Sequence, residues 1–171
     1  MISRLTGQIL EADLTEVTLD VNGVGYALTV PVSTYDRLPA LKETATFFTH
    51  LVVREDMWQL YGFSTQEERQ LFRILISVNG VGPRLALNAL SCMPVQSFYE
   101  KINAGDVKAL SRINGIGRRV AERLVVELKE RIPEFVGAPP GEAGAQGKSA
   151  LQQEALDAVA ALETLGKKKK K

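Results

Sequence analysis

Two asparagine–glycine sequences in this chain combine residue types that suit the binding of an anion. They are Asn79-Gly80-Val81-Gly82, followed closely by Arg84, and Asn114-Gly115-Ile116-Gly117, followed by Arg118 and Arg119. In both, a predicted helix ends near the asparagine and another begins after the second glycine. Glycine lets another backbone approach closely, and the free N–H groups at the start of the second helix attract anions. Together with the arginines, these groups suit a phosphodiester backbone and would not read base edges.

The two sequences belong to an internal repeat with a spacing of 35 residues. Leu75, Asn79, Gly80, Gly82, Arg84 and Ala86 recur as Leu110, Asn114, Gly115, Gly117, Arg119 and Ala121. A single Gly-x-Gly is more often only a tight turn between helices. Two copies at equal spacing, each with a basic first turn, favour paired helix-hairpin-helix motifs that grip phosphates on both strands of a groove. The predicted DNA-binding residues are Asn79, Gly80, Val81, Gly82, Arg84, Asn114, Gly115, Ile116, Gly117, Arg118 and Arg119, with the apolar residue of each loop also expected to hold that loop on its own core.

A third copy of the same letters, Val21-Asn22-Gly23-Val24-Gly25, is interpreted differently because of its flanks. Apolar residues fall at alternate positions on both sides of Asn22-Gly23, which is the favoured pair for a type I′ hairpin turn. Such a turn pairs Val21 with Val24, Leu19 with Tyr26 and Val17 with Leu28. This copy is therefore predicted to be a strand-to-strand turn and not a phosphate site.

A sequence resembling a phosphate-binding loop occurs at Ala143-Gly144-Ala145-Gln146-Gly147-Lys148-Ser149. Glu142 stands where the pattern requires its first glycine, and no strand precedes it, so no ATP site is predicted. His50 has no cluster of metal ligands around it and is predicted to be a strand residue. The sequence therefore predicts no catalytic residue, no metal site and no cofactor.

Three aromatic residues and the single cysteine are assigned to packing. Trp58, Tyr61 and Phe63 could stack bases, but packing in the core or between subunits is favoured. Cys92 is expected to be a small packed residue. As the only cysteine, it excludes an internal disulfide and fits a reducing cytosol.

Periodicity changes once along the chain. Residues 1–63 alternate apolar and polar residues with frequent turn signals, which is typical of a small β-barrel or sandwich, and a second hairpin is predicted around Arg54-Glu55-Asp56. Residues 64–135 have helical periodicity, with a capping box expected from Ser64 or Thr65. The prediction is an α+β multidomain chain. No apolar run is long enough for a membrane span, and the N-terminus lacks the features of a signal peptide.

The C-terminal part differs in composition. Residues 136–148 are predicted to be a flexible linker, residues 149–166 a capped helix that must dock on something, and residues 167–171 are all lysine.

Net charge is also unevenly distributed along the chain. Residues 1–64 hold four basic and eight acidic residues, whereas residues 65–132 hold eleven basic and seven acidic residues. A basic middle segment indicates a local anionic partner.

Taken together, the motifs MISRLTG, VNGVGYALTVP, FTHLVVREDMWQLYGF, NGVGPRLALNAL and INGIGRRVAERLVVELK make residues 1–165 resemble the RuvA family. These are Holliday-junction-binding subunits of the RuvAB branch-migration machine. The resemblance implies an oligonucleotide/oligosaccharide-binding (OB) barrel, a tandem helix-hairpin-helix domain, a linker and a small helical domain. It also implies a non-catalytic, cytoplasmic homotetramer, one or two of which bind a junction in DNA recombination, repair and the SOS response. The implied partners are junction DNA, a RuvB-type hexameric ATPase and a RuvC-type resolvase, with no membrane.

The resemblance gives Glu55 and Asp56 a role that their sequence context alone does not. By themselves they suggest an ordinary solvated turn. In the RuvA family an acidic pair at this hairpin is a pin at the junction centre, where it would repel phosphates and help to separate base pairs. The chain departs from the family after Gly166, where five lysines stand in place of the rest of the expected three-helix domain. At most one helix of the motor-binding domain is therefore recognised.

Two other classes of function remain as alternatives. A nuclease or glycosylase would use the helix-hairpin-helix motifs only for docking and would need a catalytic Lys/Asp pair or a metal cluster. An OB protein for single strands would prefer single-stranded DNA to a junction. A comparison of junction, duplex and single-stranded DNA discriminates among the three.

Overall fold

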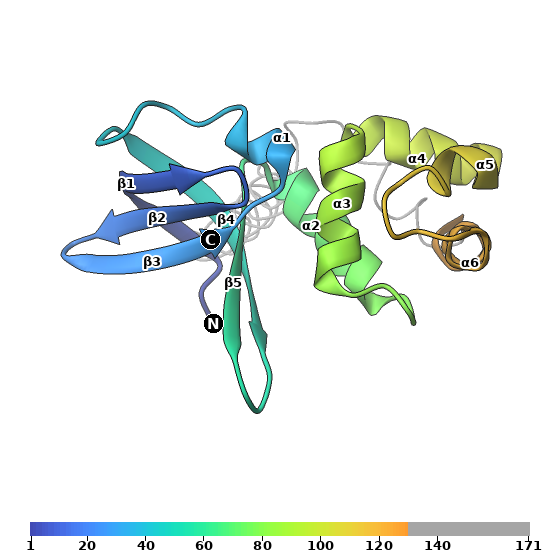
Figure 1. Ribbon diagram of the computed structural model, residues 1–171, viewed down its shortest axis with the longest axis horizontal. Coiled ribbons are helices and arrows are strands. Elements are labelled where there is room, and N and C mark those ends of the chain that lie inside the picture. Colours follow the sequence, from blue (N-terminus) through green and yellow to red (C-terminus); the bar gives the residue numbers. More distant parts are fainter. Residues whose placement is uncertain (130–171) are drawn as a thin grey trace, which may run out of the picture. The chain divides into compact units, whose positions relative to one another are not determined.

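The computed structural model describes residues 1–129; the linker, the C-terminal helix and the lysine tail predicted beyond residue 135 lie outside the described residues. Five strands form a closed barrel in the order β1-β2-β3-β5-β4 (Figure 1). Their bounds are β1 Arg4–Asp13, β2 Glu16–Val21, β3 Val24–Thr29, β4 Thr44–Val53 and β5 Trp58–Phe63. All pairs are antiparallel except β3 with β5, and the single-turn helix α1 (Val32–Tyr35) lies between β3 and β4. This confirms the OB-like barrel.

The β2–β3 hairpin is the turn that the first VNGVG sequence predicts. Val21 pairs with Val24, Leu19 with Tyr26 and Val17 with Leu28. Asn22 and Gly23 have φ of 53° and 86°, so both central residues are in the left-handed region that a type I′ turn requires. Val17, Leu19 and Leu28 are fully buried, whereas Val24, next to the turn, is 53% exposed.

The barrel is filled by alternate residues of its strands. Ile9, Val17, Leu19, Leu28, Val30, Phe47 and Leu60 form one buried cluster. A bulge in β1 between Ile9 and Glu11 breaks the alternation, and Leu10 is left exposed.

Helices follow the barrel, as the change in periodicity predicts. They are α2 Gln66–Ser77, α3 Pro83–Cys92, α4 Val95–Ala104, α5 Val107–Leu110 and α6 Arg118–Lys129. Thr65 and Glu68 form the predicted capping box at the start of α2. Helix α3 ends one residue before the Met93-Pro94 pair, which stops it. Among residues 1–129, no helix is long and apolar enough to cross a membrane.

One expectation for α3 is wrong. Cys92 is exposed rather than packed. The buried face of α3 consists of Ala86, Ala89 and Leu90, and position 92 is off the helical period of that face.

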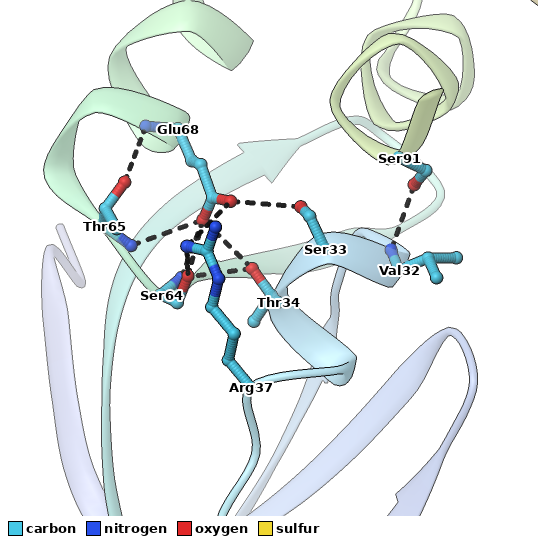
Figure 2. Close-up of polar contacts among 8 residues, drawn as sticks. All are labelled: Val32, Ser33, Thr34, Arg37, Ser64, Thr65, Glu68 and Ser91. Carbon is cyan, nitrogen blue, oxygen red and sulfur yellow. Dashed lines mark hydrogen bonds and ion pairs between the residues drawn. The ribbon is translucent and has the colours of Figure 1, made fainter. Parts of the chain in front are cut away.

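A buried carboxylate joins the barrel to α2. Glu68 is 5% exposed and accepts hydrogen bonds from Ser33, Thr34, Ser64 and Thr65 (Figure 2). Arg37 adds an ion pair at 3.7 Å. The same capping carboxylate that begins α2 therefore also ties the helix to the barrel segment around α1.

An aromatic cluster completes this joint. The ring of Phe72 from α2 lies 4.9 Å from the rings of Tyr61 and Phe63 and 5.7 Å from that of His50, measured between centroids. This confirms packing for Tyr61 and Phe63 and confirms His50 as a residue of β4. Trp58, by contrast, is 76% exposed.

Candidate nucleic-acid interface

The two later glycine loops have the same backbone structure. In the first, the amide of Val78 donates to Leu75 O and that of Val81 to Val78 O, at 3.1 and 3.0 Å. In the second, the corresponding bonds of Ile113 and Ile116 measure 3.2 and 2.9 Å. Gly80 and Gly115 have φ of 86° and 85°, a conformation that L side chains rarely adopt. The sequence repeat is therefore a structural repeat, and the loops differ from the β2–β3 turn, which joins strands.

The helices before the two loops differ in length. The first loop follows the twelve-residue helix α2, and the second follows only the single turn α5. That turn is prepared by Gly105, which ends α4 in the left-handed conformation, and by Asp106, whose side chain accepts from the amide of Ala109. The hydrogen bond from the Ala109 amide is also the main cause of the lowered pKa of the Asp106 carboxyl.

The apolar residue of each loop is an anchor. Val81 and Ile116 are 4% and 2% exposed, and their amides are the ones already bonded within the loop. They hold the loops on the core, which is one of the two roles expected of them. Their place among the DNA-binding residues stays a prediction.

The glycine amides are available. The amides of Gly80, Gly82, Gly115 and Gly117 donate to no acceptor within residues 1–129, and all four glycines are exposed. A Cβ added at Gly82 or Gly117 would meet no atom within 4 Å. Each of these two glycines directly precedes a helix, α3 or α6. Open space in front of free amides at a helix N-terminus is where an anion binds.

Each loop is supported by the other half of the repeat. The side-chain amide of Asn88 donates to Asn114 O, and the guanidinium of Arg123 donates to Asn79 O, both at 2.9 Å. Positions 88 and 123 are themselves 35 residues apart. The two bonds are thus equivalent under the repeat, and each ties one loop to the helix that follows the other loop.

Arg123 is a candidate interface residue that sequence reasoning missed. One of its guanidinium nitrogens lies 3.7 Å from the position of a Cβ at Gly80, so α6 brings a cation to the first loop. The sequence did contain a signal for it. Arg123 lies one helical turn after Arg119, at a position that the repeat also contains as Asn88. Only the fold shows that it reaches the opposite loop.

The three predicted arginines differ in their partners. Arg118 is paired with Glu122 at 2.8 Å on the surface of α6. Arg84 and Arg119 are exposed and have no ion pair with any residue that the structure describes. Their charges are thus free for an external anion.

Glu55 and Asp56 lie between β4 and β5, at the tip of the hairpin that these two strands form (Figure 1). The amide of Arg54 donates to Met57 O at 2.9 Å and closes the turn. Glu55 and Asp56 are exposed and have no ion pair among the residues described. Two uncompensated carboxylates at a tip would repel phosphates.

Comparison with known proteins follows the same division of the chain. A family model described as "RuvA N terminal domain" matches residues 1–62, which hold the barrel and the acidic hairpin. A model described as "SAM-like Helix-hairpin-helix tandem" matches residues 72–130, which hold both glycine loops. The chain belongs to the RuvA family. Membership confirms the resemblance that the sequence motifs indicate.

Curated RuvA relatives match almost the whole chain. The protein "Holliday junction branch migration complex subunit RuvA" of Shewanella frigidimarina is 43% identical over 175 residues, which cover 98% of this chain and 85% of the relative. The proteins of the same name from Pseudomonas syringae pv. syringae and Vibrio parahaemolyticus are 47% and 42% identical, covering 98% and 95% of this chain and 85% and 84% of the relatives.

Two other ionisable groups of this RuvA-family chain, the His50 imidazole and the Tyr61 hydroxyl, are packed within the protein, and their pKa values are shifted. Burial lowers the pKa of the His50 imidazole, and Arg73 and Arg69 lower it further. Burial raises the pKa of the Tyr61 hydroxyl, with Arg54 opposing the shift. Within residues 1–129, no three or more His, Cys, Asp or Glu side chains are grouped to hold a metal ion.

Proposed function

We propose that this protein binds four-way DNA junctions by their structure, as a tetramer, and brings a RuvB-type ATPase motor to them for branch migration. The names of its relatives, which are junction branch-migration subunits, support this assignment. The observation that carries it is the pair of equivalent glycine loops, whose exposed amides have no acceptor within residues 1–129. In this proposal residues 1–63 form the barrel domain and residues 64–135 the DNA-binding domain.

The two loops act on the sugar-phosphate backbone. Gly80, Gly82, Gly115 and Gly117 offer main-chain N–H groups, while Arg84, Arg119 and Arg123 supply positive charge beside them. Amide and guanidinium contacts to phosphate fix the position of a duplex without reading its bases. Because each loop is bonded to the helix that follows the other loop, the two loops bind two phosphate runs at a set spacing, as the two strands of one duplex arm present them.

The acidic hairpin acts at the crossover. A tetramer places four copies of Glu55 and Asp56 around the point where the arms meet, and their charge keeps the backbones apart from that point. The chain itself binds and shapes the junction, and the motor supplies the energy of ATP hydrolysis. A RuvC-type resolvase would use the same opened junction.

A competition gel shift tests the proposal. Labelled four-way junction is bound to the full chain, and unlabelled junction, duplex and single-stranded DNA compete at two salt concentrations with Mg²⁺ present. We expect the junction to compete best, a steep loss of affinity with salt, and intact DNA afterwards. Better competition by single strands would support a single-strand-binding barrel instead, and cleaved junctions would support a nuclease.

A further inference from the structure

A groove lies beside the acidic hairpin, between its strands and the start of α3. Its volume is about 200 Å³, and it is lined by Val52, Arg54, Met57, Gln59, Tyr61, Pro83 and Arg84. Val52 pairs with Gln59 across the two strands, and Arg54 bonds to Met57 at the turn. One face of the β4–β5 hairpin therefore forms one wall, and the first residues after Gly82 form the other.

The groove is positively charged. It contains two guanidinium groups, those of Arg54 and Arg84, and none of the described residues that line it is acidic. Both arginines are exposed, and neither forms an ion pair within residues 1–129. The opposition of Arg54 to the raised pKa of Tyr61 shows that its charge acts on the buried end of the groove. Two unpaired cations in one groove repel each other until an anion joins them.

The remaining lining suits a sugar more than an inorganic ion. Val52, Met57, Tyr61 and Pro83 give an apolar floor. The side-chain N–H of Gln59 donates to Thr29 Oγ1 at 2.6 Å, which leaves its amide oxygen as an acceptor. The volume is below the range of about 300–1,000 Å³ that is typical of small-molecule pockets. This small, open shape favours a short segment of a longer chain over a free small molecule.

We propose that this groove binds one phosphodiester with its deoxyribose, from the DNA strand that passes from the first glycine loop toward the crossover, and that Arg54 is a DNA-binding residue. The inference rests on the proposed function and deepens it. Arg54 attracts the backbone directly before Glu55 and Asp56 repel it. The change of sign within three consecutive residues sets the point at which the strand stops approaching the hairpin tip.

The test compares Arg54→Ala with Arg4→Ala in the full chain. Arg4 is an exposed arginine of β1 that lines neither the groove nor a glycine loop. Binding of labelled junction is measured over a series of salt concentrations, and thermal melting checks the fold. We expect Arg54→Ala to weaken binding roughly tenfold, and to reduce the slope of log affinity against log salt by about 0.9 for each phosphate that the variant no longer neutralises. Arg4→Ala should match the wild type.

A second arm locates the phosphate. Single neutral methylphosphonate linkages are introduced one at a time near the crossover. The groove phosphate is the one whose neutralisation weakens the wild type but not Arg54→Ala. Wild-type affinity and salt slope for Arg54→Ala, with Gly82→Ala still impaired, would overturn the groove and leave the proposed function standing. A wild-type chain without preference for junctions would overturn both.

Discussion

Substitution of the second glycine in each loop should separate DNA binding from folding. Gly82 has φ −86° and ψ 172° as the residue that caps α3, a conformation open to any residue. An alanine Cβ there, or at Gly117, meets nothing within 4 Å. The cost to stability should be at most about 1 kcal/mol, the usual difference for alanine at a helix cap. The new methyl group nevertheless occupies the space through which a phosphate must reach the amide.

The expected loss of binding follows from the hydrogen bond that is blocked. A phosphate oxygen must come to about 2.9 Å from the amide nitrogen, and a hydrogen bond to a charged group contributes about 1.5–3 kcal/mol. Gly82→Ala and Gly117→Ala should each weaken junction binding roughly ten- to a hundredfold.

The first glycine of each loop provides the contrast. Gly80 and Gly115 have positive φ, and alanine in that region costs about 1–2 kcal/mol. At Gly115 the added Cβ would also press on Leu85 Cδ2, so Gly115→Ala should be the less stable of the two. Chemical unfolding ranks the stabilities of the four variants, and a gel shift with four-way junction ranks their affinities. If Gly82→Ala and Gly117→Ala melt and bind like the wild type, phosphate does not approach these amides and the reasoning is refuted.

Three further changes test other parts of the structure. Glu68→Ala should lower the free energy of unfolding by about 3 kcal/mol, because it leaves the donors around this buried carboxylate unpaired; unfolding by urea measures it, and a loss below about 1 kcal/mol would contradict the joint. Because the pKa of His50 is lowered from 6.5, the folded state binds the proton less readily than the unfolded chain. The stability linked to this group is full above pH 6.5 and declines as the pH falls toward the lowered pKa. His50→Gln should therefore reduce the drop in the free energy of unfolding between about pH 7.5 and about pH 5.5, which urea titrations at the two pH values measure. Replacing both Glu55 and Asp56 by lysine should keep or tighten junction binding but disturb branch migration with a RuvB-type motor; normal migration would remove the pin role.

Features determined by neighbouring residues could be predicted from the sequence. The turn at Asn22-Gly23 needs only two residues that tolerate positive φ between alternating strands. The cap at Thr65 and the end of α3 before Pro94 depend on residues within one turn of the helix. The repeat predicts both glycine loops, because similar local sequences form the same backbone twice.

Features determined by tertiary contacts could not. The exposure of Cys92 depends on which face of α3 the barrel and neighbouring helices cover, and the residue type alone does not reveal that face. The groove at Arg54 brings together residues about 30 positions apart, and no periodicity connects them.

The reciprocal bonds from Asn88 to Asn114 O and from Arg123 to Asn79 O have a consequence for protein engineering. Neither half of the repeat is self-sufficient, because each supplies a side chain that completes the other. Grafting one half onto a foreign scaffold would remove the bond that ties its loop to the other half, and water would replace the lost donor at the exposed carbonyl. The smallest transferable module that keeps both bonds is the complete duplication from α2 to α6.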